Sequence, residues 1–472
     1  MEQEKMKILW LSLFFLCFTV FGSNVKFPPP QNYFKSEEES SRYLSKMKEL
    51  HQLRANKIGI TLDWNDPIFL EGKINPYLFN GKTLLPERVV DQMLEDLRNE
   101  KSRSRNHRNR EKRSITNDRN MLWNDWNQTI YIRISPGLEN FRRSVIINAT
   151  GFWSTQTCIS IVEHQSLKEE EPGIYFVESA TGCFASAFGK ANKRETISID
   201  PECSDFASIT RWIAHSLGVY QEHNRPDRDS YVTVNKNNVP IIYYYFYFYK
   251  QQWKFVNDYV VDYDYGSNMH FGGFEYSLNG SRVMQPTDKE YRGSIGQIEG
   301  PTFADVKRIN RAYCSTTCNP WPNNCLNNGY LDPRLCITCK CPPPFTGPLC
   351  AHIRSGSDDG CPESSLVATN TFDTLGASGD RTCYFVVTAP VGRQVQFKMA
   401  YFGIESIGPI VMKGSCLYSY VELNWRADIT NGGARYCDLY TPTTVNRTET
   451  NRLIVIYKGH PGALFELNYR SV

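Results

Sequence analysis

The chain has 472 residues, more than a single hydrophobic core usually organises, so we expect several domains. Charged residues make up 22 % of it and the net charge is +3, a balance that indicates no polyanionic partner, nucleic acid included. Fifteen cysteines favour an oxidising compartment.

The N-terminal residues are typical of a secretory signal peptide. Two lysines precede the apolar run 8–21, which is short for a membrane span. Small residues at its end predict cleavage after Gly22 or Ser23 and a signal peptide of residues 1–22. An uncleaved signal anchor is the alternative. Because no later apolar stretch is long enough to span a bilayer, we expect a secreted, extracellular product without a membrane span.

The cysteines and the glycosylation motifs agree with secretion. Cys17 leaves with the signal peptide, and the even number that remains suits disulfide pairing. Four Asn-x-Ser/Thr motifs predict N-glycosylation. Their acceptors are Asn127, Asn148, Asn279 and Asn446.

Residues 23–113 are expected to form a propeptide. They contain no cysteine, and residues 41–58 carry apolar side chains at helical spacing. The region ends in a basic run whose last four residues, Arg-Glu-Lys-Arg, match a subtilisin-like convertase site. Cleavage after Arg113 would make Ser114 the first mature residue. A nuclear-localisation signal or a nucleic-acid arm is the alternative for such a run, but the signal peptide argues against both.

The segment 211–221 has the frame of a zinc-protease helix. That frame reads His-Glu-x-x-His-x-x-Gly-x-x-His, in which two histidines share one helical face and the glutamate is the general base. Here the three ligand positions hold Arg211, His215 and Gln221, and the general-base position holds Trp212. One ligand of the expected type is therefore present.

The residues that follow resemble the astacin family of metzincin proteases. Residues 222–231 match its extended signature, and residues 267–271 match its methionine turn, with Phe271 where a tyrosine normally reaches the zinc. Residues 300–313 are similar to its closing helix. The resemblance implies an α+β astacin/metzincin-like peptidase domain over residues 114–316.

The resemblance also implies roles for residues outside the helix. Glu222 matches the carboxylate that receives the ammonium group of the processed N-terminus, here that of Ser114. In the propeptide, Lys82 stands where a family aspartate blocks the zinc. The disulfides that the resemblance implies are Cys158–Cys314 and Cys183–Cys203.

These substitutions remove the metal chemistry. A zinc site needs three His, Cys or carboxylate ligands, and His215 alone cannot supply them. A guanidinium about 4 Å from a dication would be repelled by roughly 8 kcal/mol at an effective dielectric near 20. Trp212 cannot accept a proton from water. We therefore expect that zinc, the cofactor implied by the resemblance, is bound weakly or not at all.

An aromatic run at 243–249 has two interpretations. It could be a recognition surface beside the cleft, or the core-facing side of a helix or strand with some tyrosines at its margin. We favour the second.

Residues 317–351 resemble an EGF-like module. A region this small needs disulfides to fold. Its Cys-x-x-Cys at 336–339 could indicate zinc or redox chemistry, but secretion and the spacing favour disulfides, whose connectivity the sequence leaves open. The cysteines are Cys318, Cys325, Cys336, Cys339, Cys341 and Cys350.

Residues 361–472 resemble a CUB domain, an all-β sandwich. Alternating stretches such as 395–399 and 453–457 suit its strands. Ser419 stands where a calcium-binding aspartate is usual, so we expect protein contacts rather than calcium binding. The resemblance implies two bridges, Cys361–Cys383 and Cys416–Cys437.

The sequence thus favours an astacin-like secreted protein that is proteolytically inactive. It would bind extracellular proteins of the matrix or cuticle through its former cleft or its EGF-like and CUB modules. The alternative is an active secreted zinc metalloendopeptidase that cleaves such proteins. That enzyme would need an unconventional site around His215, His223 and His270.

Overall fold

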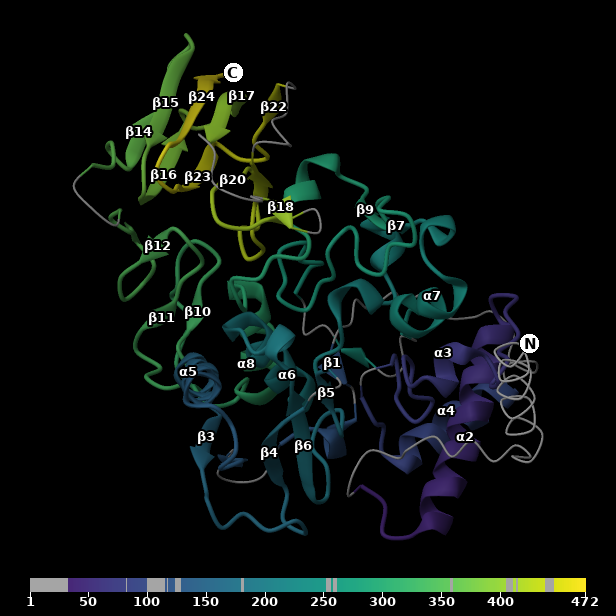
Figure 1. The fold of residues 1–472 in the computed structure, drawn as a ribbon. Coiled ribbons are helices and arrows are strands. Elements are labelled where there is room, and N and C mark those ends of the chain that lie inside the picture. Colours follow the sequence, from purple (N-terminus) through teal and green to yellow (C-terminus); the bar gives the residue numbers. More distant parts are fainter. Residues whose placement is uncertain are drawn as a thin grey trace, which may run out of the picture. The chain divides into compact units, whose positions relative to one another are not determined.

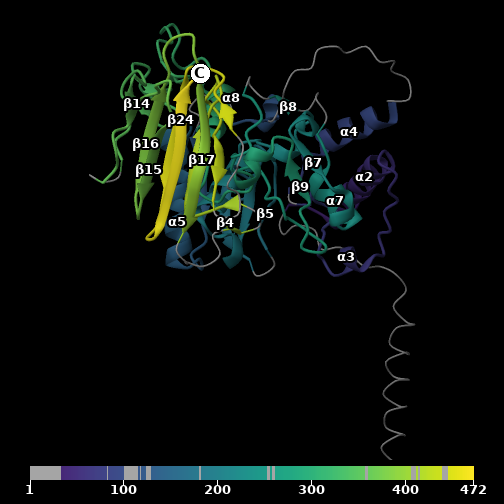
Figure 2. The same ribbon diagram turned by 90° about the horizontal axis from the view of Figure 1, so that it is seen from above.

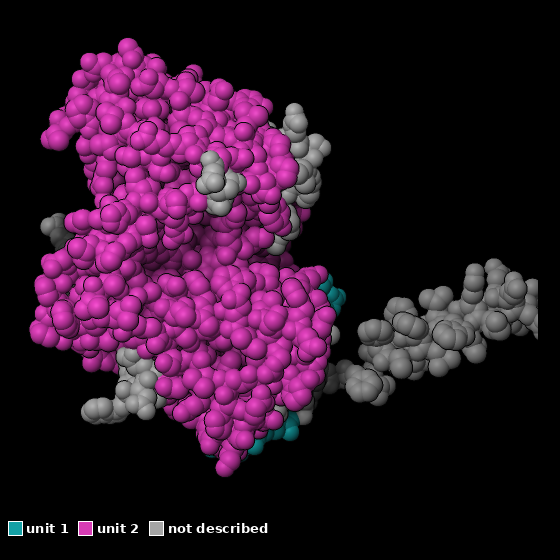
Figure 3. Space-filling view, turned by 90° about the vertical axis from the view of Figure 1, so that its left-hand side faces the viewer, with its two compact units in different colours: residues 1–81, 87–101 teal, residues 82–86, 102–472 magenta. Residues whose placement is uncertain are grey.

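The computed structural model describes residues 33–81, 83–99, 115–116, 118–123, 129–179, 182–251, 256–257, 261–356, 360–404, 411–412, 415–437 and 445–472. The chain forms two compact units, coloured separately in Figure 3. Unit 1 comprises residues 1–81 and 87–101, and unit 2 comprises residues 82–86 and 102–472. Within the described ranges, no helix has both the length and the apolar composition needed to cross a membrane.

Unit 1 is helical. Ser36 caps its first helix by accepting a hydrogen bond from Glu39 N at 3.1 Å. Buried residues recur at helical spacing, among them Met47 and Leu50 on this helix and Leu94 on its packing partner. The helices are α2 (Glu37–Asn56), α3 (Pro67–Leu70) and α4 (Glu87–Asn99), and α2 packs against α4.

The first domain of unit 2 is built on a five-stranded sheet in the order β3-β2-β4-β6-β5 (Figure 1). Its strands are parallel except β5, which runs antiparallel at one edge. Isoleucines 130, 132 and 134 alternate with more exposed residues and face the core. The strands are β2 (Thr129–Ile134), β3 (Ser160–Glu163), β4 (Gly173–Glu178), β5 (Phe184–Ala185) and β6 (Arg194–Ile199).

Two helices, α5 (Asn140–Gln156) and α6 (Phe206–Ser216), pack against each other beside this sheet. The indole Nε1 of Trp153 donates to Thr210 O at 3.1 Å, which ties α5 to the middle of α6. The same core includes residues of α8 (Phe303–Tyr313), such as Ile309. Helix α8 begins with a capping box between Thr302 and Asp305.

The rest of this domain contains helix α7 (Ile241–Phe248) and short strand pairs. Helix α7 carries the aromatic run, and Tyr244, Tyr245 and Phe248 are buried on it. The core-facing interpretation of this run is therefore confirmed. The strand pairs are β1 (Ile115–Thr116) with β8 (Val256–Asn257), and β7 (Val232–Val234) with β9 (Met284–Pro286).

The small module that follows is held by disulfides. Its connectivity, left open by the sequence, is Cys318–Cys336, Cys325–Cys339 and Cys341–Cys350. Its strands pair as β10 (Tyr330–Leu331) with β11 (Cys339–Lys340), and β12 (Phe345–Thr346) with β13 (His352–Ile353).

The C-terminal domain is a sandwich of two sheets, whose long strands run alongside one another in Figure 2. Their orders are β14-β16-β23-β20-β21 and β15-β24-β17-β22. The first comprises β14 (Ser365–Val367), β16 (Thr382–Thr388), β20 (Tyr420–Asn424), β21 (Ala434–Tyr436) and β23 (Arg452–Lys458). The second comprises β15 (Asp373–Ser378), β17 (Val395–Ile404), β22 (Asn446–Arg447) and β24 (Ala463–Ser471). A further pair joins β18 (Val411–Met412) to β19 (Ser415–Cys416).

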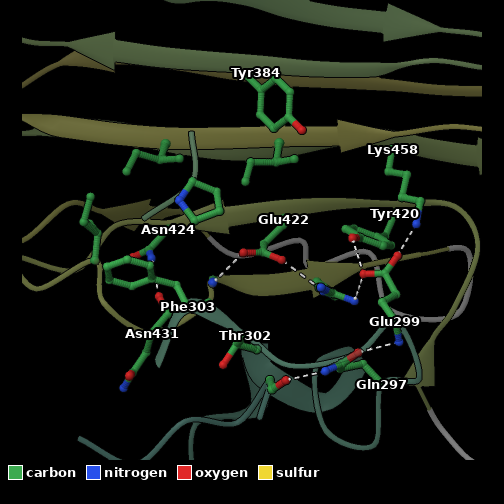
Figure 4. Close-up of a pocket in the computed structure, with 18 of the residues that line it drawn as sticks. Gln297, Glu299, Thr302, Phe303, Tyr384, Tyr420, Glu422, Asn424, Asn431 and Lys458 are labelled. Atoms are coloured by element: carbon green, nitrogen blue, oxygen red, sulfur yellow. Dashed lines mark hydrogen bonds and ion pairs between the residues drawn. The ribbon is translucent and has the colours of Figure 1, made fainter. Parts of the chain in front are cut away.

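The sandwich packs directly on the first domain of unit 2. Glu299 of the first domain accepts a hydrogen bond from Tyr420 OH at 2.8 Å and pairs with Arg435 at 2.9 Å and with Lys458 (Figure 4). At Gly293 the backbones approach so closely that a Cβ would lie 2.3 Å from Arg435 O. Glu299 and its three partners line a cavity of about 440 Å³, whose other lining residues come from both domains and include Pro343 of the small module.

Candidate functional site

Helix α6 is fixed at both ends by its own sequence. At its start Asp205 accepts a hydrogen bond from Ser208 N at 2.9 Å, which satisfies an otherwise unpaired amide of the first turn. Ile213 is fully buried on its apolar face. After the helix, Gly218 takes a φ of +78°, and a Cβ there would lie 2.7 Å from a threonine methyl group. The chain therefore reverses where only glycine fits without strain.

Arg211 and His215 lie one turn apart on α6. Arg211 is partly exposed, and its Nε donates to Asn268 O at 2.7 Å. Burial lowers the pKa of Arg211 and the nearby charge of Glu275 opposes that shift, but a guanidinium stays charged at neutral pH. Asn268 is held in turn, because its Nδ2 donates to Ala207 O at 3.0 Å.

His215 and Trp212 face a largely apolar environment. His215 is buried, and its Nδ1 donates to Val219 O at 2.9 Å. Its ring centroid lies 6.2 Å from that of Phe188 and 5.6 Å from that of Trp212. Trp212 is itself a member of the hydrophobic core, so the general-base position of the motif is occupied by a packing residue.

His223 is committed to the structure around the turn at 267–271. Its Nδ1 accepts from Phe271 N at 3.3 Å, and its Nε2 donates to Tyr247 O at 3.2 Å. Its ring stacks on Phe271 with centroids 4.0 Å apart. Both nitrogens of His223 are therefore used in hydrogen bonds away from the ligand positions of the motif.

His270 is committed in the same way. Its Nδ1 donates to Phe271 O and its Nε2 accepts from Tyr263 OH, each at 2.7 Å. Burial lowers the pKa of His270 to about 4, so the ring is neutral at physiological pH.

Gln221 completes the three ligand positions. It is buried, and its Oε1 has no hydrogen-bond partner within the described part of the chain. The described residues also contain no group of three or more His, Cys, Asp or Glu side chains that could hold a metal ion.

A buried ion network supports the segment after α6. Glu222 pairs with Arg225 at 3.1 Å and with Arg308 at 3.1 Å, and it accepts from Asp264 N at 3.0 Å. Burial alone would raise the pKa of Glu222, but the charges of Arg308 and Arg225 outweigh it and hold the pKa below its usual value. Ser114, whose ammonium group the resemblance places on Glu222, lies outside the described residues.

The edge strand β5 carries a partner from upstream in the chain. Thr83 forms a parallel bridge with Ala185 of β5. Leu84 and Leu85, which follow it, are fully buried. This short segment belongs to unit 2, whereas the residues on both sides of it belong to unit 1.

Other predicted sites are placed as follows. Lys82, Arg113 and Asn127 lie outside the described residues. Asn148 and Asn279 are exposed and Asn446 is partly exposed. Ser419 is buried. The structure joins the cysteines that the resemblance pairs, namely Cys158–Cys314, Cys183–Cys203, Cys361–Cys383 and Cys416–Cys437.

Three elements of the site escaped sequence reasoning. The carbonyl of Asn268 is a backbone group that no motif marks. Arg308 lies 86 residues from Glu222, and only the resemblance of its segment to a closing helix could have directed attention to it. The pairing of Thr83 with β5 left no periodic signal.

Comparisons with known proteins agree with this architecture. The family model described as "Astacin", which is a family of peptidases, matches residues 117–314. The chain is 34 % identical over 450 residues to zinc metalloproteinase nas-34 of Caenorhabditis elegans. The matched region covers 92 % of this chain and 72 % of that protein. The chain is 28 % identical over 395 residues to zinc metalloproteinase nas-36 of the same nematode, over 82 % of this chain and 61 % of that protein.

Among solved structures, high choriolytic enzyme 1, a hatching enzyme zinc-protease from Oryzias latipes, is 29 % identical in sequence to this chain. The match has a TM-score of 0.36 and covers 42 % of this chain and 92 % of the chain of that enzyme. The predicted fold class is confirmed as an astacin-like α+β protease domain followed by a disulfide-rich module and a CUB-like sandwich. With a relative above 30 % identity that is matched over most of its length, this chain belongs to the astacin family of peptidases.

Proposed function

We propose that this chain is a secreted astacin-family homologue that binds extracellular proteins without cleaving them. Zinc is the metal expected from membership of this family. The donors around α6 therefore decide whether the chain can act as a peptidase. The observation that carries the proposal is Arg211 at the first ligand position, anchored on the carbonyl of Asn268.

The residues present do not fit zinc. Of the three ligand positions only His215 offers a donor that zinc prefers, whereas Gln221 offers a neutral amide and Arg211 a positive charge. Trp212 provides no group that could take a proton from an attacking water. Phe271 has no oxygen where the family has a tyrosine.

The competing function is an active zinc endopeptidase with an unconventional site. It would need His223 and His270 beside His215. Both imidazoles already use their two nitrogens in hydrogen bonds to Phe271, Tyr247 and Tyr263. Freeing them would leave buried polar groups without partners, which costs about 1–3 kcal/mol for each group.

Two features support extracellular binding. Seven disulfides, which suit an oxidising compartment, hold the three domains of unit 2. The disulfide-rich module and the CUB-like sandwich are types of domain that commonly make protein contacts outside cells. We therefore assign binding to the cleft together with these two modules, with matrix or cuticle proteins as the expected partners.

Metal analysis of the full-length secreted protein tests the proposal. Wild type should contain little zinc after dialysis and should not cleave denatured protein substrates. The variant Arg211→His, Trp212→Glu, Gln221→His restores the ligand and base types on the same scaffold. It should retain about one zinc ion per chain, and adding His215→Ala should remove it.

Stoichiometric zinc in wild type, together with cleavage that His215→Ala abolishes, would overturn the proposal. A restored variant that is secreted but binds no zinc would show that the scaffold no longer brings the three positions together.

A further inference from the structure

Arg211 is a charged donor with unused hydrogen-bonding capacity. A guanidinium carries five N–H donors, and within the described residues only Nε–H of Arg211 has an acceptor, Asn268 O. Its two terminal amino groups have no hydrogen-bond acceptor there. A pair of such donors is the arrangement that binds a carboxylate with two parallel hydrogen bonds.

The Arg211 side chain is held in place, and the residue is partly exposed. Asn268 is buried, and its N–H donates to Asp305 at 2.9 Å while its side chain donates to Ala207 O and to Thr210. The acceptor for Arg211 is thus rigid, which reduces the entropy lost when a ligand binds. Arg211 is partly exposed, and this exposed part is where a ligand would bind.

Gln221, at another ligand position of the motif, also has an unused hydrogen-bonding atom. Gln221 is buried, and its Oε1 has no partner within the described residues. A buried amide oxygen without a hydrogen-bond partner is costly, and an N–H donor would lower that cost.

The charge of Glu275 is near enough to act on Arg211, yet the two side chains form no hydrogen bond. Glu275 therefore reduces the positive potential at this point but leaves the donors of Arg211 unused. The hydrogen bonds, rather than net charge alone, would select the ligand.

We propose that Arg211 forms a carboxylate-binding site, at which its guanidinium binds the acidic side chain or the C-terminus of an extracellular peptide. This inference rests on the proposed function, because it requires a cleft that binds without cleaving. The guanidinium holds an anion by charge-assisted hydrogen bonds, and Trp212 offers no base to activate water. The ligand therefore stays intact.

Fluorescence anisotropy with three labelled peptides tests the site on the full-length secreted protein. The peptides are penta-alanine with a free C-terminal carboxylate, the same peptide as its C-terminal amide, and that amide with glutamate in the central position. At least one carboxylate peptide should bind about tenfold more tightly than the neutral amide, equivalent to about 1.4 kcal/mol. Which of the two binds distinguishes a C-terminal from a side-chain ligand.

Two variants locate the site. Arg211→Gln should abolish the preference for a carboxylate, and Arg211→Lys, which keeps the charge without the paired donors, should retain part of it. Lys168→Gln removes one positive charge from an exposed position of the same domain and should leave the preference unchanged. Secretion yield and disulfide oxidation show whether each variant folds.

The inference falls if wild type does not prefer either carboxylate peptide, or if Arg211→Gln and Lys168→Gln behave alike. Zinc content is measured on the same preparations. Low zinc without a carboxylate preference would overturn this inference and leave the proposed function standing, whereas stoichiometric zinc with peptide cleavage would overturn the proposed function itself.

Discussion

Arg211 illustrates both what the sequence predicts about the site and what it does not. The motif spacing alone placed an arginine at a ligand position, because helical periodicity fixes which residues share a face. Its anchor could not be predicted, since the carbonyl of Asn268 lies 57 residues away and any residue type could have supplied it. The same holds for Glu222, to which the family resemblance directs attention, whereas its pairing with Arg308 was not predicted.

The Glu222 network predicts a large effect of one substitution. Arg308→Met removes one of two cations from a fully buried carboxylate and should lower the free energy of unfolding by about 3–5 kcal/mol. Urea denaturation of the purified protein measures this change.

Arg142→Met is the matched control. Arg142 pairs with the exposed Glu178 at 2.7 Å, and loss of such a pair should cost about 0–1 kcal/mol. Equal shifts of the urea midpoint for the two variants would contradict the assignment of Glu222 as the centre of a buried network.

At the scale of elements, local sequence signals account for where helices begin and end, but they do not reveal which polar groups are buried. Helix α6 spans Phe206–Ser216, and both its cap at Asp205 and its ending near Gly218 are encoded locally. No such local signal marks Glu195 of β6, although its carboxyl is buried in the core that β6 forms with α6.

Glu195 predicts a pH dependence of stability. Burial raises its pKa to about 8 from an ordinary 4.5, with Ser216 acting in the opposite direction. Between these values the folded state keeps a proton that the unfolded chain has lost. The contribution of this group is therefore complete below pH 4.5, and it declines by about 1.4 kcal/mol per pH unit as pH rises toward the folded pKa.

Thermal denaturation between about pH 5 and pH 8 tests this dependence. Glu195→Gln has nearly the same shape and cannot ionise, so its melting temperature should fall less than that of wild type as pH rises. Parallel profiles for the two proteins would refute the prediction.

At the scale of the molecule, the packing of the sandwich on the first domain is the main feature that sequence reasoning did not foresee. Domain resemblances describe each module separately and say nothing about the surfaces between them. Here Glu299 contacts three residues of the sandwich, and Ser294 accepts from Arg435 N at 3.0 Å. The close approach of the backbones at Gly293 further indicates that the first domain of unit 2 and the sandwich form a tightly packed interface.

We expect these two domains to unfold together. In Glu299→Ala, Arg435 and Lys458 lose a partly exposed partner, which should weaken the interface by about 1–3 kcal/mol and split one calorimetric transition into two. Glu466→Ala, at an exposed position of β24, is the control and should keep a single transition. Two transitions already present in wild type would contradict the prediction.

The pairing of Thr83 with β5 affects whether proteolytic cleavage near residue 113 would release the N-terminal segment. Hydrolysis of one peptide bond near residue 113 changes connectivity but leaves intact the bridge between Thr83 and Ala185 of the edge strand. No cysteine precedes residue 114 in the expected proform after the signal peptide, so nothing covalent would retain the severed piece. Its departure would then be a dissociation equilibrium, governed by dilution and by competing ligands, and the nicked protein could persist as a two-chain complex.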